Sequence, residues 1–334
     1  MPHPRRIPPY FKHIKPLPIL KKSGFIPKYA KIYVAKKHQY TVVRDVAITG
    51  DAPKDIIRLY EYGIARKSDI KSWSIYIAKL GHKWYPNESI TEQFLTDVGK
   101  TLGFNMADSR LCILGGQIRF LSKYFLNIEE KLEHGADLYA AFLQDKSFID
   151  DVEKEKATQD FFTVHFTREV FEAMYPQSAS GLFQDFMRLL FFDALVGNND
   201  RHLYNWGVIS DIKKQSPRFA PIYDSARALF WNSPEDRLPR NFNKIESYCL
   251  GSCPKIGIEK QSKTKINHFD LIARHQEHFR NDFQIITIFE SGLLGKVFDL
   301  LDDDYKALFS ETRRQLIRKV LLWRFQRMKE ILRL

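Results

Sequence analysis

Short runs of apolar and β-branched residues, separated by polar turns, occupy the first third of the chain. Runs that alternate apolar and polar positions, or that are rich in β-branched and aromatic residues, predict strands. They span residues 31–35, 40–44, 73–79, 110–114 and 117–125. Gly115-Gly116 joins the last two runs and is a strong hairpin signal. A short helix or turn is expected over residues 55–62, and a helix from Pro86 to Leu102 that Gly103 ends.

From about residue 127 the apolar residues recur at helical spacing. Helices are expected over residues 130–143, 167–174, 181–196, 268–279 and 311–334. The segment 182–196 is apolar on almost all sides, which predicts a buried helix. Residues 206–209 and 219–223 predict a short hairpin after it. We therefore expect an α+β fold, with a small β-rich lobe at residues 46–126 and a larger, mostly helical lobe at residues 127–334.

The composition adds a basic segment to this outline. The chain has 334 residues, 44% of them hydrophobic, which is enough to bury a substantial core. Its net charge of +12 is concentrated at the N-terminus, because residues 1–44 hold eleven lysines and arginines and no acidic residue. Residues 1–45 are therefore expected to form a basic extension. A solvated or lobe-wrapping extension is favoured over contact with nucleic acid, since a charge run alone is weakly specific.

Several protein classes are disfavoured by what the sequence lacks. No stretch reaches the length of about 18 apolar residues that a membrane span needs, and no secretory signal is evident, so we expect a cytoplasmic protein unless specialised export moves it. Three cysteines are an odd number in a long chain, so reduced thiols are expected. Cys249 and Cys253 form a lone C-x3-C pair, which disfavours a structural metal site.

The loop from Gly197 to Gly207 holds the residues with the strongest chemical signal. Asp200 precedes Asn205 by five positions, and the following hairpin brings Asn205 close to Asp224. In phosphoryl transfer, an Asp can deprotonate the acceptor hydroxyl while an Asn and an Asp hold Mg²⁺. A polar turn is the alternative, because turns use the same residue types. The full set, after a buried helix and before a hairpin, favours an active site.

Two further residues of this loop have open roles. His202 either contacts the phosphates or holds the loop in shape. Arg201 is either a salt-bridge partner or a solvent-facing side chain. The sequence does not decide between these alternatives.

The β-rich lobe supplies candidates for phosphate binding. Lys79 ends its strand, and Glu92 on the next helix is its candidate partner in an ion pair. Glu92 could instead close a capping box with Ser89, and Glu88 is a rival for the pair. Glu92 is preferred because it lies inside the helix.

The loop that should cover the phosphates is poor in glycine. Only Gly63 is available, and residues 63–73 precede the lysine strand at a plausible distance. Their basic side chains and backbone N–H groups could cradle a phosphate, whereas an exposed connector is the equal alternative. No G-x-x-x-x-G-K-[ST] motif occurs, which argues against a Walker-type nucleotide fold.

The segments LVGNNDRHLYNWGVI and FAPIYDSARALF resemble the catalytic core of the HipA-like serine/threonine kinases of bacteria, especially their smaller CtkA-like branch. The order Asp-Arg-His-x-x-Asn is also similar to that of phosphoinositide kinases, whose fold is akin. The resemblance implies a two-lobed, protein-kinase-like fold. It implies Asp200 as the catalytic residue, Asn205 and Asp224 as metal ligands, and Lys79 as the nucleotide lysine.

The same resemblance implies further residues and partners. An adenine-facing hinge should lie near residues 122–126, with Lys123, Tyr124 and Phe125 at its centre. Ser68 is a candidate for autophosphorylation. The implied reaction is ATP- and Mg²⁺-dependent transfer of the γ-phosphate to a serine or threonine of a protein, in a toxin–antitoxin setting with an antitoxin-like regulator.

Two other functions remain open. One is a lipid or inositol kinase that uses the basic extension at the membrane, although no amphipathic anchor accompanies it. The other is a catalytically weak nucleotide-binding module whose basic residues 1–44 contact nucleic acid. The joint presence of Asp200, Asn205 and Asp224 favours catalysis.

Overall fold

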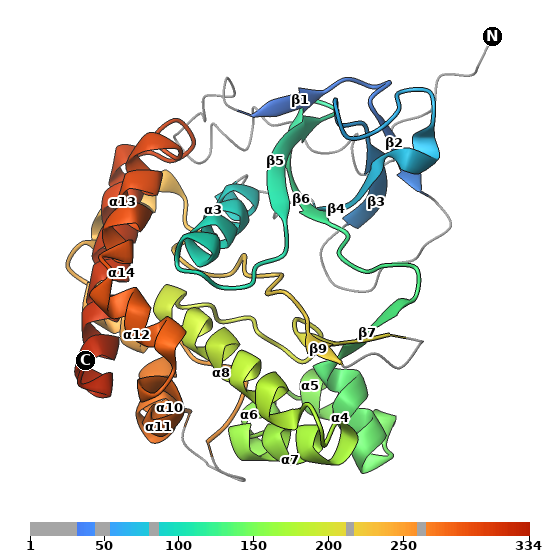
Figure 1. Cartoon of the computed structure of the whole chain (residues 1–334). Helices are drawn as coiled ribbons and strands as arrows, with labels where there is room; N and C mark the ends of the chain where they lie inside the picture. Colours follow the sequence, from blue (N-terminus) through green and yellow to red (C-terminus); the bar gives the residue numbers. More distant parts are fainter. Residues whose placement is uncertain (1–31, 44–53, 80–86, 212–216, 259–264) are drawn as a thin grey trace.

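The computed structural model describes residues 32–43, 54–79, 87–211, 217–258 and 265–334. In this part of the chain a curved sheet with one helix beside it lies above a mostly helical region (Figure 1). The sheet has the strand order β1-β5-β6-β4-β3-β2. Its strands are β1 (Tyr33–Ala35), β2 (Tyr40–Val43), β3 (Lys54–Leu59), β4 (Ser74–Lys79), β5 (Ser109–Leu114) and β6 (Gln117–Lys123).

The strands expected from the apolar pattern are confirmed, and the hairpin at Gly115-Gly116 joins β5 to β6. The short helix or turn expected over residues 55–62 is wrong, because residues 54–59 form β3. This strand pairs with β2 on one side and β4 on the other, so both of its edges are hydrogen-bonded. Its β-branched Ile56 and Ile57 are buried, which suits a strand inside a sheet.

Strands β1 and β2 lie within the segment, residues 1–45, that was expected to form a basic extension. Residues 33–35 pair in parallel with β5, and residues 40–43 form the edge strand beside β3. The C-terminal part of the expected extension thus belongs to the sheet. Residues 1–31, which hold most of its basic residues, lie outside the described part of the chain.

Helix α3 (Asn87–Thr101) packs against β5 and β6 of this sheet. As predicted, Ile90, Phe94, Leu95 and Val98 are buried on one helical face. This packing matters for the site because it fixes Glu92, which lies in the second turn of α3, beside the end of β4.

The helical region contains a second, three-stranded sheet in the order β7-β8-β9. Its strands are β7 (Glu130–His134), β8 (Gly207–Asp211) and β9 (Arg218–Phe219). The helix expected over residues 130–143 is therefore wrong in its first five residues, which pair with β8. The helix begins only at Gly135, where Asp137 accepts a hydrogen bond of 3.1 Å from the backbone N–H of His134. The hairpin expected at residues 206–209 and 219–223 is present in the pairing of β8 with β9, but its second strand ends at Phe219, and Ile222 pairs with Met106 instead.

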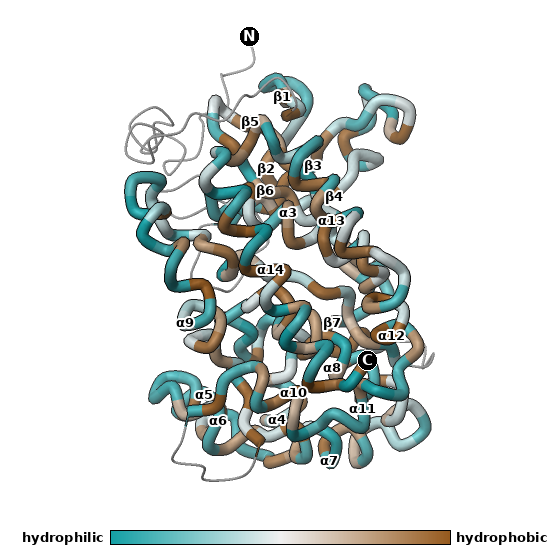
Figure 2. The backbone as a smooth tube through the Cα atoms, turned by 90° about the vertical axis from the view of Figure 1, so that its left-hand side faces the viewer, coloured by the Kyte–Doolittle hydropathy of each residue, from teal (hydrophilic) through white to brown (hydrophobic). Residues whose placement is uncertain are grey.

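The helices of this region surround α8 (Ala179–Val196), which crosses the region in Figure 1. Helix α8 is buried on almost all sides, as expected. In Figure 2, apolar and polar stretches alternate along most of the outer helices, which fits helices with one face turned inward. The helices are α4 (Gly135–Leu143), α5 (Lys146–Lys154), α6 (Thr158–Phe161), α7 (Val164–Met174), α8 (Ala179–Val196), α9 (Ile245–Leu250), α10 (His268–Arg274), α11 (Gln276–Arg280), α12 (Phe283–Glu290), α13 (Leu293–Asp303) and α14 (Glu311–Leu332). Within the described ranges, none of the helices combines the length and apolar character needed to span a bilayer.

Candidate active site

The loop with the strongest chemical signal begins at Gly197, directly after α8. Gly197 has a φ of +77°, a left-handed conformation that glycine adopts without strain. A Cβ at this position would lie 3.0 Å from the guanidinium carbon of Arg324 on α14. Both the backbone conformation and the close approach of Arg324 therefore favour glycine at this position.

A buried ion pair holds the loop to α8. Arg201 and Asp193 are 5% and 1% exposed, and Nε and Nη2 of Arg201 donate to the two carboxylate oxygens of Asp193 at 2.8 and 2.9 Å. Nη1 of Arg201 donates to the backbone oxygens of Asn205 (2.8 Å) and Tyr223. Nη2 also donates to Oγ of Ser225 at 2.8 Å. Arg201 thus joins the helix, the loop and the segment that carries Asp224, which decides its role in favour of a salt bridge.

The same carboxylate orders the start of the loop. Asn198 is fully buried and donates from Nδ2 to Oδ1 of Asp193 at 2.9 Å. Its side-chain oxygen accepts a bond of 3.3 Å from the backbone N–H of Asp200. The sequence interpretation did not include Asp193, although an acidic residue inside the otherwise apolar run 189–196 is a detectable signal.

The side chains of Asn205 and His202 both form hydrogen bonds with backbone groups of the same loop. Nδ2 of Asn205 donates to the backbone oxygen of Asp200 at 2.8 Å, which leaves the amide oxygen of Asn205 as its remaining acceptor. Nδ1 of His202 accepts a bond of 3.3 Å from the backbone N–H of Tyr204. The contacts of His202 therefore support a role in shaping the loop.

Asp224 lies between the two lobes and meets the lysine of the sheet. Nζ of Lys79 lies 3.0 Å from Oδ1 of Asp224 and 2.6 Å from Oε1 of Glu92. The structure therefore contains the expected Lys79–Glu92 pair, in which the carboxylate of Glu92 accepts a hydrogen bond from Lys79. Asp224 itself has a φ of +55°, a conformation that costs free energy for a residue other than glycine and is often found at functional sites.

The ammonium group of Lys79 forms ion pairs with two carboxylates, those of Glu92 and Asp224. These charges, together with burial, set the pKa values of the three groups. Burial alone would lower the pKa of Lys79, but Asp224 and Glu92 outweigh it and raise the pKa, so Lys79 is charged. Burial raises the pKa of Glu92 to about 7, against the attraction of Lys79. Burial would also raise the pKa of Asp224, but Lys79 and then Lys54 hold it at about 2. Asp224 is thus the ionised partner of Lys79.

Asp200 faces a different cation. Oδ2 of Asp200 lies 3.2 Å from Nε of Arg227, whose side chain is 42% exposed. Burial raises the pKa of Asp200, and Arg227 opposes this rise. Asp224 also raises the pKa of Asp200, which indicates that the two carboxylates lie near each other.

This site and fold agree with a known family. Residues 46–291, well over half of the chain, match the HipA-like C-terminal domain. The chain belongs to this HipA-like family. The predicted family is thereby confirmed.

Individual relatives are distant in sequence. Over 240 residues the chain is 20% identical to the serine/threonine-protein kinase CtkA of Helicobacter pylori, covering 71% of this chain and 70% of that protein. Over 62 residues it is 35% identical to Y4dM of Sinorhizobium fredii, a protein named as a kinase, covering 19% of this chain and 15% of that protein. The crystal structure of CtkA matches with a TM-score of 0.68 at 14% identity, over 90% of this chain and 96% of that one. The predicted α+β, two-lobed kinase-like fold is confirmed.

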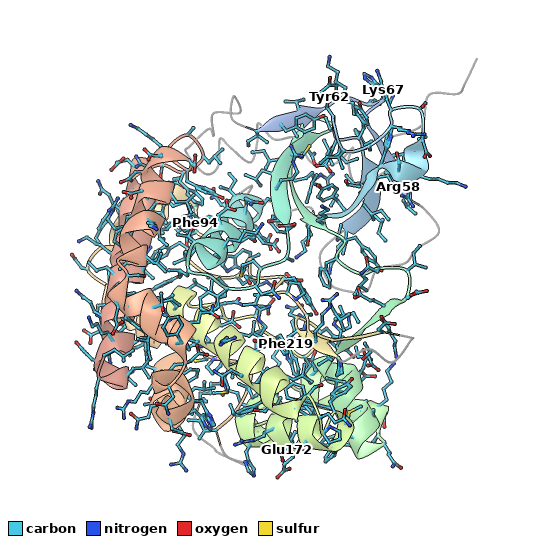
Figure 3. All side chains as sticks on the ribbon, in the orientation of Figure 1. Arg58, Tyr62, Lys67, Phe94, Glu172 and Phe219 are labelled. Carbon is cyan, nitrogen blue, oxygen red and sulfur yellow. The ribbon has the colours of Figure 1, made fainter. Side chains whose placement is uncertain are left out.

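One part of the expected site is wrong for this HipA-like chain. The loop with Gly63 and Ser68 joins β3 to β4 where Leu59 pairs with Ser74, whereas Lys79 lies at the other end of β4. Five residues of strand, at about 3.3 Å each, separate the two ends by about 17 Å. In Figure 3, Tyr62 and Lys67 of this loop lie at the outer end of the sheet. The loop is therefore the exposed connector, and neither Gly63 nor Ser68 lies where phosphates would bind beside Lys79.

The register of the sheet adds a second lysine, which the sequence pattern alone does not indicate. Lys54 on β3 is directly opposite Lys79 on β4, so both side chains leave the same face of the sheet. Its charge helps to lower the pKa of Asp224. The site therefore has a second lysine beside Asp224. A lysine at the start of a strand is too common to be singled out without the register.

The expected hinge connects β6 to β7 and passes the site. The backbone N–H of Tyr124 donates to the oxygen of Ile75 at 2.9 Å, which ties the segment to β4. The side chains of Lys123 and Tyr124 are exposed, while Phe125 lies with its ring 5.9 Å from the ring of Tyr223. Because Tyr223 precedes Asp224, the segment expected to form the hinge is adjacent to the carboxylate cluster.

Proposed function

We propose that this chain is a kinase that transfers the γ-phosphoryl group of ATP to a serine or threonine hydroxyl of a protein. The observation that carries the proposal is the convergence of the Asp200–Asn205 loop, Asp224 and Lys79. Arg201 holds the loop and the segment of Asp224 together, because it donates hydrogen bonds to the backbone of Asn205 and of Tyr223. Membership of the HipA-like family, the fold shared with CtkA and the name of that relative as a serine/threonine-protein kinase support the same reaction.

Asp200 is the base in this proposal. A carboxylate beside the transferred phosphoryl group accepts a hydrogen bond from the attacking hydroxyl and then its proton. The pKa of Asp200 is raised by burial, which makes the carboxylate a better proton acceptor. Its partner Arg227 is partly exposed, and such a pair contributes only about 0–1 kcal/mol, so a substrate can replace it at little cost.

The oxygen donors of Asn205 and Asp224 fit Mg²⁺. Asp224 is ionised at any ordinary pH because its pKa is about 2, and Asn205 keeps its amide oxygen available. Mg²⁺ prefers oxygen ligands and is held by few protein groups together with phosphate oxygens and water. When bound, it neutralises charge on the phosphates of ATP.

Lys79 and Glu92 complete the nucleotide site in this proposal. The ammonium of Lys79, which Glu92 holds at 2.6 Å, neutralises negative charge on the phosphates once Asp224 serves as a metal ligand. Lys54 adds a second positive charge on the same face of the sheet. The hinge at residues 123–125 would then face the adenine.

Transfer from γ-labelled ATP tests the proposal. The purified chain is incubated with Mg²⁺, alone and with cell extract, beside Asp200→Asn, Asp224→Asn and the control Asp299→Asn, which changes an exposed residue of α13. We expect label on protein for the wild type and the control and none for the two site variants. No labelling by the wild type, or equal labelling by all four proteins, would show that the proposal is wrong.

The same experiment separates the other functions. Acid hydrolysis of labelled protein to phosphoserine or phosphothreonine supports the protein kinase, and autophosphorylation would label the chain itself. Label found only in a lipid or inositol fraction would instead identify a lipid kinase.

An antitoxin-like regulator remains part of the proposal, and co-purification of the tagged chain from its native cells tests for one.

A further inference from the structure

A pocket of about 770 Å³ lies on the helical lobe away from the active site. It is bordered by α7, by the corner between α10 and α11, and by Phe183 of α8. Phe183 lies on α8 and Gly197 directly follows this helix, fourteen residues later, which corresponds to about 21 Å along a helix. Figure 1 shows α7, α10 and α11 at the far side of the helical lobe from the sheet.

Three potential metal ligands meet at the α10–α11 corner. His275, Glu277 and His278 each offer one ligand atom, and these atoms all lie within 4.8 Å of one another. Nε2 of His278 is 3.5 Å from Oε1 of Glu277, and the rings of the two histidines are 6.3 Å apart. The backbone is held here, because the N–H of His278 donates to the oxygen of His275 at 3.1 Å. The three side chains therefore leave a single ordered turn.

One nitrogen of this cluster lacks the partner that burial normally requires. Nε2 of His275 is buried and has no hydrogen-bond partner among the described residues. Buried polar atoms are usually hydrogen-bonded, because leaving one unpaired costs free energy. A cation bound to this nitrogen would remove that cost.

The pocket also includes Arg168 and Arg274, so the argument for a cation that bonds to nitrogen rests on the types of ligand present. His165 and Glu169 of α7 line the same pocket, with Nε2 of His165 3.3 Å from Oε1 of Glu169. Two imidazoles and a carboxylate form a ligand set that suits zinc and its neighbours in the first transition row. Mg²⁺ and Ca²⁺ prefer oxygen ligands alone.

We propose that His275, Glu277 and His278 bind a transition-metal ion of the zinc class. A water molecule, or His165 from the lining of the same pocket, would complete a tetrahedral set. A bound ion would fix the α10–α11 corner and, through His165, join it to α7. This site is separate from the phosphate site and does not depend on the proposed reaction.

Cobalt(II) serves as the probe, since a tetrahedral Co²⁺ site absorbs strongly in the visible range. The full chain is stripped with EDTA, desalted, supplied with excess Mg²⁺ to occupy oxygen-only sites, and titrated with Co²⁺. We expect saturation at one equivalent with the bands of a tetrahedral site, and displacement by one equivalent of Zn²⁺. No saturable binding by the wild type would overturn the proposal.

Four single-residue variants locate the ion. His275→Ala and His278→Ala should each weaken Co²⁺ binding by more than about 100-fold, because even the outer-shell partners of a metal ligand contribute about 10–100-fold to affinity. His38→Ala removes an exposed histidine of the β1–β2 turn and should leave binding unchanged. Circular dichroism confirms that each variant is folded. Wild-type affinity in both His275→Ala and His278→Ala, or loss of binding in Cys253→Ser instead, would place the ion elsewhere and refute the proposed site.

Discussion

Arg201 and Asp193 form a two-point ion pair, with hydrogen bonds of 2.8 and 2.9 Å, inside the helical lobe. The pair connects the most buried helix of the lobe to the loop that carries Asp200 and Asn205. Because Arg201 also bonds to the backbone of Tyr223, it sets the distance between that loop and Asp224. The positions of the three oxygen-bearing side chains therefore depend on a residue pair that need not touch any substrate.

This dependence gives a first prediction. Asp193→Asn leaves the Arg201 guanidinium buried without its counter-ion, and breaking a buried pair in this way costs about 3–5 kcal/mol of unfolding free energy. Urea denaturation of the variant and the wild type measures the difference. The double variant Asp193→Leu with Arg201→Met should lose less stability than Asp193→Asn, yet it should lose phosphoryl transfer. A single variant as stable as the wild type would contradict the role given to the pair.

The lysine of the sheet gives a second prediction. Lys79→Met leaves Asp224 and Glu92 without their shared ammonium group, and we expect transfer from ATP to fall by about 100- to 1,000-fold, the loss typical of one preorganised electrostatic contact. Glu92→Gln retains the pair of Lys79 with Asp224 and should have a smaller effect, mainly a higher KM for ATP. Steady-state kinetics with varied ATP separates KM from kcat. An equal loss in both variants would refute the separate roles of the two partners.

The glycine at the start of the loop gives a third prediction. Gly197→Ala forces a side chain into a left-handed conformation and against Arg324, so we expect a loss of about 1–3 kcal/mol in unfolding free energy. Gly295→Ala on α13 is the matched control, since its Cβ would have no neighbour within 4 Å and its φ is not positive. That change should be neutral or stabilising by about 0.5–1 kcal/mol. Denaturation curves for both variants make the comparison, and equal stabilities would count against the strain argument.

Much of the site could be predicted because its residues follow one another in the sequence. The Asp200–Asn205 spacing and the hairpin before Asp224 are local features, and a strand end followed by an amphipathic helix brings Lys79 to Glu92. The phosphate loop was assigned wrongly because sheet register decides which loop meets Lys79, and register is set by pairing between distant strands. Lys54 was missed for the same reason. The expectation of a helix or turn over residues 55–62 was wrong because pairing with the neighbouring strands, and not the local pattern, decides the structure of this segment.

The buried histidine behind the loop gives a prediction about pH. Nε2 of His268 bonds to the backbone oxygen of Asn198 at 2.9 Å, and burial, followed by Arg324, lowers the pKa of His268 to about 3. An unfolded histidine takes up a proton near pH 6.5, at about its ordinary pKa. Between these two pKa values the unfolded state binds more protons, so the unfolding free energy falls as pH falls, by up to about 1.4 kcal/mol per pH unit.

His268→Gln tests this dependence, because glutamine can still donate to Asn198 and does not take up a proton. Urea denaturation at pH 7 and pH 5 should show a smaller loss of stability on acidification for His268→Gln than for the wild type. His38→Gln, which changes an exposed histidine, is the control and should behave as the wild type. The same loss in all three proteins would show that His268 is not the group responsible.

The central claim is that Asp200 acts on the acceptor hydroxyl and Asp224 acts on the nucleotide. The most direct measurement combines the rate of phosphoryl transfer with the affinity for ATP in the presence of Mg²⁺, for the wild type and for Asp200→Asn. We predict a fall in the transfer rate of about 100- to 10,000-fold, the usual contribution of a general base, with little change in the dissociation constant of ATP. Transfer at the wild-type rate by Asp200→Asn would contradict the account.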